Sequence, residues 1–214
     1  EGLRAAKELA PLNALAQHAS GETPYTAQLA WRQGHPELAV QSPLTGLALE
    51  LPAPLGKSAA TRAPLSAHMR VQNTNGVLQD QLQLDWGSRA FALYERDVSG
   101  PIPRVLRGSL TLGLPGTQAP SLPDKGVFAY AKLPQFSLET WQALVPNAPG
   151  LATNPTASSM PVWQGYLPTV FGFQADSMTA DGRTLHKVVA GGLRDGRHWL
   201  VNVDASELSG HLDY

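Results

Sequence analysis

The residues Gly56-Lys57-Ser58 match the end of a phosphate-binding loop of the form Gly-x4-Gly-Lys-[Ser/Thr]. In such a loop the first glycine lets the backbone curl, so that its N–H groups point at the phosphates. Here Leu51 occupies that position, and the intervening Pro52 and Pro54 have no N–H to donate. No amphipathic helix pattern follows the lysine. The segment is therefore predicted to be structural and to bind no nucleotide.

Other chemistry is sparse in this chain. It contains no cysteine, which excludes disulfides, thiolate catalysis and thiolate metal sites together. The histidines do not form a His-Glu-x-x-His pair, and no Gly-x-Ser-x-Gly nucleophile motif occurs. His186 and His198 come near each other only across predicted hairpins, where surface histidines are the simpler interpretation. Glu50 and Asp85 lie on the polar sides of predicted strands, where solvated carboxylates are expected. We predict no enzymatic activity, no metal and no cofactor.

The tryptophans offer a second interpretation. Aromatic rings can form a stacking platform for sugars, although core or interface packing is their more common use. A β-rich module that binds a glycan or a protein therefore stays open as an alternative. The residues concerned are Trp31, Trp86, Trp141, Trp163 and Trp199.

The amino-acid composition argues against some classes of binding partner. Charged residues make up 15% of the 214 positions, below the roughly 25% typical of globular domains, while 43% are hydrophobic. The net charge is −1 and no basic run is visible, so neither nucleic acid nor an anionic membrane surface is expected to bind by charge. No apolar run reaches the roughly 20 residues of a membrane span. Because the chain starts at Glu1 and ends at Tyr214, we expect a piece of a longer protein, with any targeting segment outside it.

The spacing of apolar residues divides the chain into two regions with different predicted secondary structure. Apolar residues recur at helical spacing over residues 3–18, which predicts an N-terminal helical segment within residues 1–20. From residue 21 to 214 the pattern alternates with period two, which predicts one β-rich domain. The alternating apolar positions include Tyr25, Leu29, Trp31, Leu47, Leu49, Leu51, Leu82, Leu84, Trp86, Leu110, Leu112, Leu114, Trp199, Val201 and Val203.

Turn and cap signals place the elements. Asn75-Gly76, Asp181-Gly182 and Asp195-Gly196 are hairpin signals, because these residues tolerate positive φ angles. They predict antiparallel strands near 170–179, 184–193 and 197–205. Ser137 is a predicted N-cap for a short helix, and Pro146 is predicted to stop it. Residues 147–161, rich in Pro, Ala, Ser and Thr, are predicted to form a long loop.

Many apolar strand faces in a weakly charged chain leave two arrangements open. In a closed sandwich the faces pack on each other, whereas in an open, curved sheet they line a groove that needs an apolar ligand.

The stretch "SPLTGLALELPAPLGK", Ser42 to Lys57, resembles a recurring segment of the YhdP family, within the wider AsmA-like group of large periplasmic proteins. The family pattern is Ser-x-Leu-x-Gly-Leu-x-Leu-x-Leu-Pro-x-Pro-Leu-Gly-Lys. "SGETPYTAQLAW", "LPQFSLETWQAL" and "VNVDASELSGHLDY" are similar to further family segments, so the resemblance spans residues 21–214. The helix entry departs from the family, because Phe136 replaces a leucine and Glu139 is shifted from the usual acidic position.

The resemblance implies a fold and a function. The fold would be mainly β, an elongated, curved antiparallel sheet forming an open, groove-like half-pipe with one or two short helices. The chain would be an internal piece of a periplasmic protein, anchored in the inner membrane by a segment absent from it and implicated in phospholipid transport to the outer membrane. Its partners would be phospholipid acyl chains and the remaining segments of the same long chain. The expected groove residues are Leu47, Leu49, Leu82, Leu84, Trp86, Leu110, Leu112, Phe171, Phe173, Trp199, Val201 and Val203.

Overall fold

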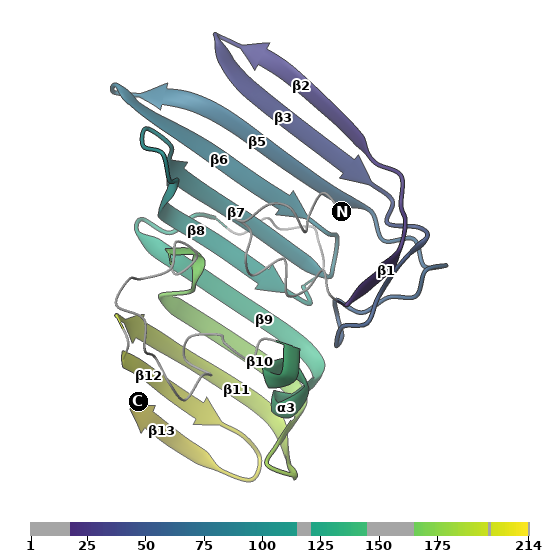
Figure 1. The fold of residues 1–214 in the computed structure, drawn as a ribbon. Helices are drawn as coiled ribbons and strands as arrows, with labels where there is room; N and C mark the ends of the chain where they lie inside the picture. The colour runs from purple at the N-terminus through teal and green to yellow at the C-terminus, as the bar shows by residue number, and fades with distance from the viewer. Residues whose placement is uncertain (1–17, 115–120, 145–164, 197, 214) are drawn as a thin grey trace.

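The structure, a computed structural model, describes residues 18–114, 121–144, 165–196 and 198–213. Within them, one curved sheet of eleven strands dominates the molecule (Figure 1). The fold is mainly β with one short helix, and the sheet is not closed on itself, as the resemblance implied. None of the helices in the described part of the chain has the length and apolar character that crossing a membrane requires.

Strands of the large sheet follow one another in space almost as they do along the chain. From one edge to the other the order is β2, β3, β5, β6, β7, β8, β9, β10, β11, β12 and β13. Their bounds are β2 (Thr26–Arg32), β3 (His35–Ser42), β5 (Leu65–Thr74), β6 (Val77–Asp85), β7 (Ala90–Asp97), β8 (Arg104–Leu112), β9 (Gly126–Ser137), β10 (Val170–Ala180), β11 (Arg183–Asp195), β12 (His198–Asp204) and β13 (Ser209–Asp213).

The sheet departs from a purely antiparallel arrangement at β9. This strand runs parallel to both of its neighbours, β8 and β10, while every other neighbouring pair is antiparallel. Parallel neighbours need a crossover of about a dozen residues or more. The stretches of chain that join β8 to β9 and β9 to β10 are long enough for such crossovers. The sheet is therefore mostly antiparallel, as expected, and these two parallel pairs were not predicted, because periodicity predicts strands but not the direction in which they pair.

The three hairpin turns predicted from the sequence are present. Asn75 and Gly76 have φ values of 54° and 84°, and Asp181 and Gly182 have φ values of 50° and 71°. Gly196, in the third turn, has a φ of 60°. The strands that the last two turns join, β10, β11 and β12, lie within about three residues of their predicted bounds.

Helix α3 (Leu138–Leu144) begins where the N-cap signal placed it. The Ser137 hydroxyl accepts a hydrogen bond from the backbone N–H of Thr140 at 3.3 Å, which satisfies one of the free donors of the first turn. The predicted helix over residues 3–18, the predicted stop at Pro146 and the predicted loop over residues 147–161 lie outside the described residues.

The family-like segment forms less strand than expected and lies outside the large sheet. It contributes β4 (Leu47–Leu49), which pairs with β1 (Ala19–Gly21) in a separate two-stranded sheet. The strand stops before Leu51, so the predicted third alternating leucine is not part of it. Gly46 provides the expected bend: its φ is 91°, and a Cβ there would lie 2.3 Å from the carbonyl oxygen of Glu22.

Candidate functional site

Strand register gives the large sheet one almost continuous apolar face. Residues that are paired across neighbouring strands share a face, and along each strand every second residue shares it. Tracing the pairs from β6 to β12 connects apolar side chains on every strand. We call this surface the apolar face; it comprises Leu82, Leu84, Ala92, Leu110, Leu112, Ala129, Ala131, Phe171, Phe173, Ala190, Trp199, Val201 and Val203.

Nine of the twelve residues predicted to line a groove lie on the apolar face, namely Leu82, Leu84, Leu110, Leu112, Phe171, Phe173, Trp199, Val201 and Val203. They come from β6, β8, β10 and β12, which are separated in sequence. Each of them is half-buried rather than sealed from solvent. Whether this face contacts lipid stays a prediction.

The other three predicted residues lie elsewhere. Trp86 follows the end of β6, is 9% exposed, and donates its ring N–H to the carbonyl oxygen of Ala63 at 3.1 Å. Leu47 and Leu49 pack against the small cluster that Trp86 forms with Leu44 and Ala63. These three side chains form a cluster of their own, which adjoins the apolar face because Ala90, the partner of Leu112, packs against it. The sequence pattern could not reveal this, because it cannot tell which sheet a strand joins.

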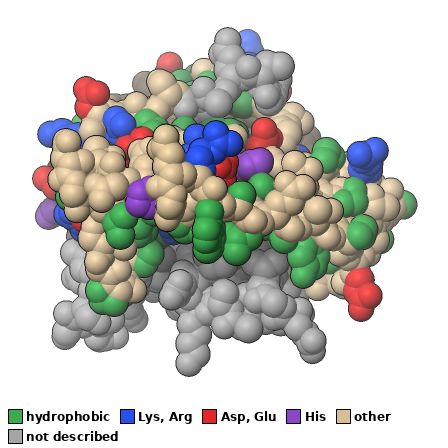
Figure 2. Space-filling model, turned by 90° about the horizontal axis from the view of Figure 1, so that it is seen from above, with side chains coloured by type: hydrophobic (Ala, Val, Ile, Leu, Met, Phe, Trp, Pro, Cys, Tyr) green, Lys and Arg blue, Asp and Glu red, His purple; other side chains and the backbone are tan. Residues whose placement is uncertain are grey.

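The opposite face of the sheet carries most of the charge. Glu95 accepts a hydrogen bond from Arg107 at 2.7 Å, and Glu37 pairs with Arg32 and Arg70 at 3.2 and 3.0 Å. Seen from above, as in Figure 2, rather than onto this face, the molecule shows charged side chains of both signs interleaved with uncharged and hydrophobic ones. Pairing of this kind gives no single-sign surface for nucleic acid on that side.

Aromatic side chains extend the apolar face toward α3. The rings of Phe171 and Trp199 lie 5.9 Å apart between centroids, edge to face. Phe136 contacts Phe173 at 5.0 Å and stacks on Trp141 of α3 at 6.1 Å. Helix α3 thus lies over the apolar face beside β9 and β10 (Figure 1).

One charged network interrupts the apolar face. Asp80, only 2% exposed, accepts two hydrogen bonds from Arg96, one from Nε at 2.8 Å and one from Nη2. Arg96 Nη1 also donates to the Tyr166 hydroxyl at 2.9 Å. Burial opposes the charged form of Arg96, but the hydrogen bonds to Asp80 and Tyr166 outweigh it and raise the pKa of the guanidinium. The guanidinium of Arg96 therefore stays charged although it is largely buried.

Residues 165–168 are held against the same face. The Tyr94 hydroxyl donates to the Tyr166 carbonyl at 3.0 Å, and burial raises the pKa of the Tyr94 phenol well above its usual range. Arg194 donates to the carbonyls of Pro168 and Leu167 at 2.9 and 3.3 Å. This segment crosses from β7 toward β11 at the rim where β10 begins.

Lys57 has a structural role. Its ammonium donates to the carbonyl oxygens of Leu44 at 2.7 Å and Ser58 at 2.9 Å, and also to that of Leu47. Burial, with the nearby Arg89 as a second cause, lowers the pKa of Lys57. The side chain that a phosphate-binding loop would aim at phosphates is therefore engaged with the loop's own backbone.

We expect no nucleotide binding at this loop. Titrating the protein with millimolar ATP and magnesium in a calorimeter should give only heats of dilution, because the Lys57 ammonium already has three carbonyl acceptors. A saturable heat signal that Lys57→Ala abolishes would contradict this prediction.

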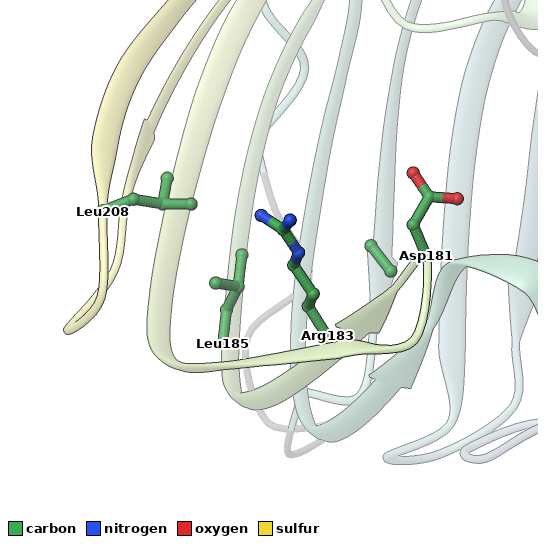
Figure 3. A pocket seen from close by; sticks show the side chains of 5 residues that line it. Asp181, Arg183, Leu185 and Leu208 are labelled. Atoms are coloured by element: carbon green, nitrogen blue, oxygen red, sulfur yellow. The ribbon is translucent and has the colours of Figure 1, made fainter.

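A pocket lies at the rim opposite to residues 165–168. Its volume is about 460 Å³, and we call it the rim pocket. It is formed at the turn between β10 and β11 and beside the turn between β12 and β13, and Figure 3 shows the labelled side chains directed into the hollow of the curved sheet. The lining residues are Ala180, Asp181, Arg183, Leu185 and Leu208.

The remaining candidates for chemistry do not assemble. Among the described residues, no three His, Cys, Asp or Glu side chains come together as a metal site would require. His186 lies 2.6 Å from a Glu207 oxygen, whereas His198 pairs with Asp195 at the far end of β11. Trp31 is on edge strand β2, Trp86 is in its own cluster and Trp141 is on α3, so these three form no common platform. Trp163 lies outside the described residues.

Sequence reasoning missed the Asp80–Arg96–Tyr166 network and the rim pocket. Asp80 stands between two glutamines in a strand whose next apolar positions are leucines, so its only local signal was a charged residue in phase with Leu82 and Leu84. Arg96 and Tyr166 are distant from it in sequence, and no local pattern connects them.

Comparison with known proteins gives a family match but no similar solved structure. The family model described as "YhdP protein" matches residues 2–214. No curated protein and no solved structure matches this chain significantly.

Proposed function

Because the chain belongs to the YhdP family, we propose that it is a non-enzymatic, lipid-conducting segment of a periplasmic protein. In this proposal, a segment outside the chain anchors the protein in the inner membrane. The protein conducts phospholipid toward the outer membrane and so maintains the envelope barrier.

The observation that carries the proposal is the apolar face of an open sheet. Half-buried apolar side chains run from Leu84 on β6 to Val201 on β12, with the charged Arg194 beside Trp199 at one rim, and no second sheet packs on them within the described residues. Exposed apolar surface of that extent is unfavourable in water unless a ligand covers it. Acyl chains suit such a surface because they need no hydrogen-bond partners.

The edges of the sheet support the proposed partner, the remaining segments of the same long chain. Every residue of β2 and of β13 is exposed, including Leu29 at 66%, Trp31 at 67% and Leu212 at 61%. Uncovered edge strands with apolar side chains invite pairing with another strand. Further strands added at either edge would lengthen the apolar face without changing its chemistry.

The test is site-specific photocrosslinking in the full-length protein in cells. A photoreactive residue at Leu84 or Phe171 should crosslink phospholipid, because both positions are on the apolar face. The matched controls are the adjacent positions Gln83 and Val170, which face the other way, and these should give no lipid adduct. Equal yields at all four positions, or none at any, would contradict the proposal.

A second measurement tests whether these positions line a groove or belong to a sealed core. Leu84→Asp or Phe171→Asp in a sealed core would cost at least the roughly 2–5 kcal/mol of a large-to-small core substitution. We expect a smaller loss of unfolding free energy in this chain, together with loss of lipid crosslinking at neighbouring positions. If both variants unfold the chain and neither face crosslinks lipid, these positions are ordinary core.

A further inference from the structure

The apolar face continues to the rim pocket, where its chemistry changes. Phe136, which pairs with Met178 and through it with Leu185, contacts the ring of Phe173 on the apolar face. Leu185 and Leu208 give the pocket an aliphatic wall, while Asp181 and Arg183 bring one negative and one positive charge to it. Figure 3 shows both charged side chains directed into the same hollow as the two leucines.

The backbone on both sides of this pocket is firmly held. The Asp181 N–H donates to Glu139 Oε1 at 2.5 Å, which ties the β10–β11 turn to the start of α3. Glu207 accepts from the His186 N–H at 2.8 Å and contacts the imidazole, which holds the turn that carries Leu208. Hydrogen bonds from its own backbone N–H and then from Asp181 lower the pKa of Glu139, and those from the His186 N–H and imidazole lower the pKa of Glu207, so both carboxylates are ionised at neutral pH.

The two charged side chains of the rim pocket have no partner among the described residues. In the described part of the chain, neither the Arg183 guanidinium nor the Asp181 carboxylate forms a hydrogen bond or an ion pair. The two are separated by one residue and do not neutralise each other at contact distance. Glu139 and Glu207, in contrast, already have partners. The rim pocket therefore presents one free cation and one free anion beside an aliphatic wall.

We propose that the rim pocket binds the headgroup of a zwitterionic phospholipid of the phosphoethanolamine type. Arg183 would hold the phosphodiester through charge-assisted hydrogen bonds, and Asp181 would hold the ammonium. The first carbons of the acyl chains would lie against Leu185 and Leu208 and continue onto the apolar face. This inference rests on the proposed function, since it names the lipid class for which the apolar face provides the path.

Charge balance favours this ligand over an anion. Asp181 lines the pocket together with the single guanidinium of Arg183, so the lining carries no net charge and does not favour free phosphate or a net anionic headgroup. His186, on the same strand, faces Glu207. A zwitterion keeps the contact with Arg183 and neutralises Asp181 as well.

The test uses lipids that have identical brominated acyl chains and differ only in the headgroup. Phosphoethanolamine, phosphoglycerol and diacylglycerol forms are titrated from nonionic detergent micelles into the 214-residue protein, and tryptophan quenching reports acyl-chain binding. Trp199, which packs on Phe171, is the internal probe. The unmodified protein should bind the phosphoethanolamine lipid about tenfold more tightly than diacylglycerol, the factor expected of a charged hydrogen bond.

Two variants test the two charged side chains of the pocket one at a time. Arg183→Gln should reduce the affinity for both phospholipids to near that of diacylglycerol. Asp181→Asn should remove only the preference for phosphoethanolamine over phosphoglycerol, and asparagine tolerates the φ of 50° at this position. The control is Arg104→Gln at the opposite rim, where Arg104 pairs with Asp97 at 3.2 Å, and its affinities should be unchanged.

The outcomes distinguish this proposal from the broader one. If all three lipids bind equally and Arg183→Gln has no effect, the headgroup proposal fails while acyl-chain binding stands. If no lipid quenches tryptophan, the proposed function fails with it. Tighter binding of phosphoglycerol than of phosphoethanolamine, or competition by inorganic phosphate, would show an anion site and overturn the zwitterion assignment.

Discussion

Asp80→Asn should lower the free energy of unfolding by about 3–5 kcal/mol, the usual cost of breaking a buried ion pair. Asp80 is 2% exposed and the Arg96 side chain is 12% exposed, so the variant leaves a guanidinium buried without its counter-ion. The amide also replaces one of the two acceptor oxygens by an NH2 donor, so Arg96 can no longer bond a separate oxygen with each of Nε and Nη2. Urea denaturation followed by circular dichroism measures the effect.

The matched control is Asp97→Asn on the neighbouring strand. Asp97 pairs with Arg104 at 3.2 Å, but the Arg104 side chain is 74% exposed, so we expect a change within about 1 kcal/mol. Replacing both partners, with Asp80→Leu and Arg96→Met together, should recover much of the loss, because no charge is then left buried. Equal effects of Asp80→Asn and Asp97→Asn would show that the buried pair contributes no more than a surface pair.

The network also matters for the apolar face. Arg96 contacts the Tyr166 hydroxyl, and Tyr94 contacts the Tyr166 carbonyl, so the ion pair positions residues 165–168 over the sheet. A charge in an otherwise apolar surface is tolerated here because each donor of the pair has an acceptor. Asp80 on β6 and Arg96 on β7 therefore mark where the uncharged part of the apolar face ends on these two strands.

Lys57→Met should lower the free energy of unfolding by about 2 kcal/mol or more, from buried carbonyls left without a donor. Methionine keeps an unbranched stem of similar length, so packing changes little while the donors to Leu44, Leu47 and Ser58 are lost. Arg89, which donates to the carbonyls of Pro54 and Gly56, holds the same loop and should keep it attached. Denaturation and amide hydrogen exchange measure the effect.

Hydrogen exchange localises the change. The Leu49 and Lys57 amides pair with each other's carbonyls at 2.8 and 3.0 Å, and their protection should fall in Lys57→Met. Lys132→Met is the control, because Lys132 is exposed on β9 and its loss should leave both stability and protection unchanged. Unaltered protection at residues 49 and 57 would contradict the role of Lys57 as a backbone clamp.

Local patterns in the sequence were sufficient for the elements and for much of the candidate site. Alternation of apolar residues predicted β2, β6, β8 and β12, since side chains on a strand alternate between its faces whatever the strand pairs with, and the turn signals predicted β10 and β11. Asn-Gly and Asp-Gly predicted the turns because positive φ is a property of single residues. For the same reason nine of the predicted groove residues, such as Leu84 and Phe171, share one face.

Tertiary structure alone decided everything that depends on which strands become neighbours. Four features connect residues that are far apart in the chain. They are the parallel pairing of β9, the separate sheet that holds Leu47 and Leu49, the buried Asp80–Arg96 pair, and the pocket that Arg183 and Leu208 both line. Alternation specifies a face but not a partner, because the period of two is the same in every strand. The sequence by itself therefore determined strands, turns and family, whereas packing determined whether each leucine or charge faces a core, a rim or the apolar face.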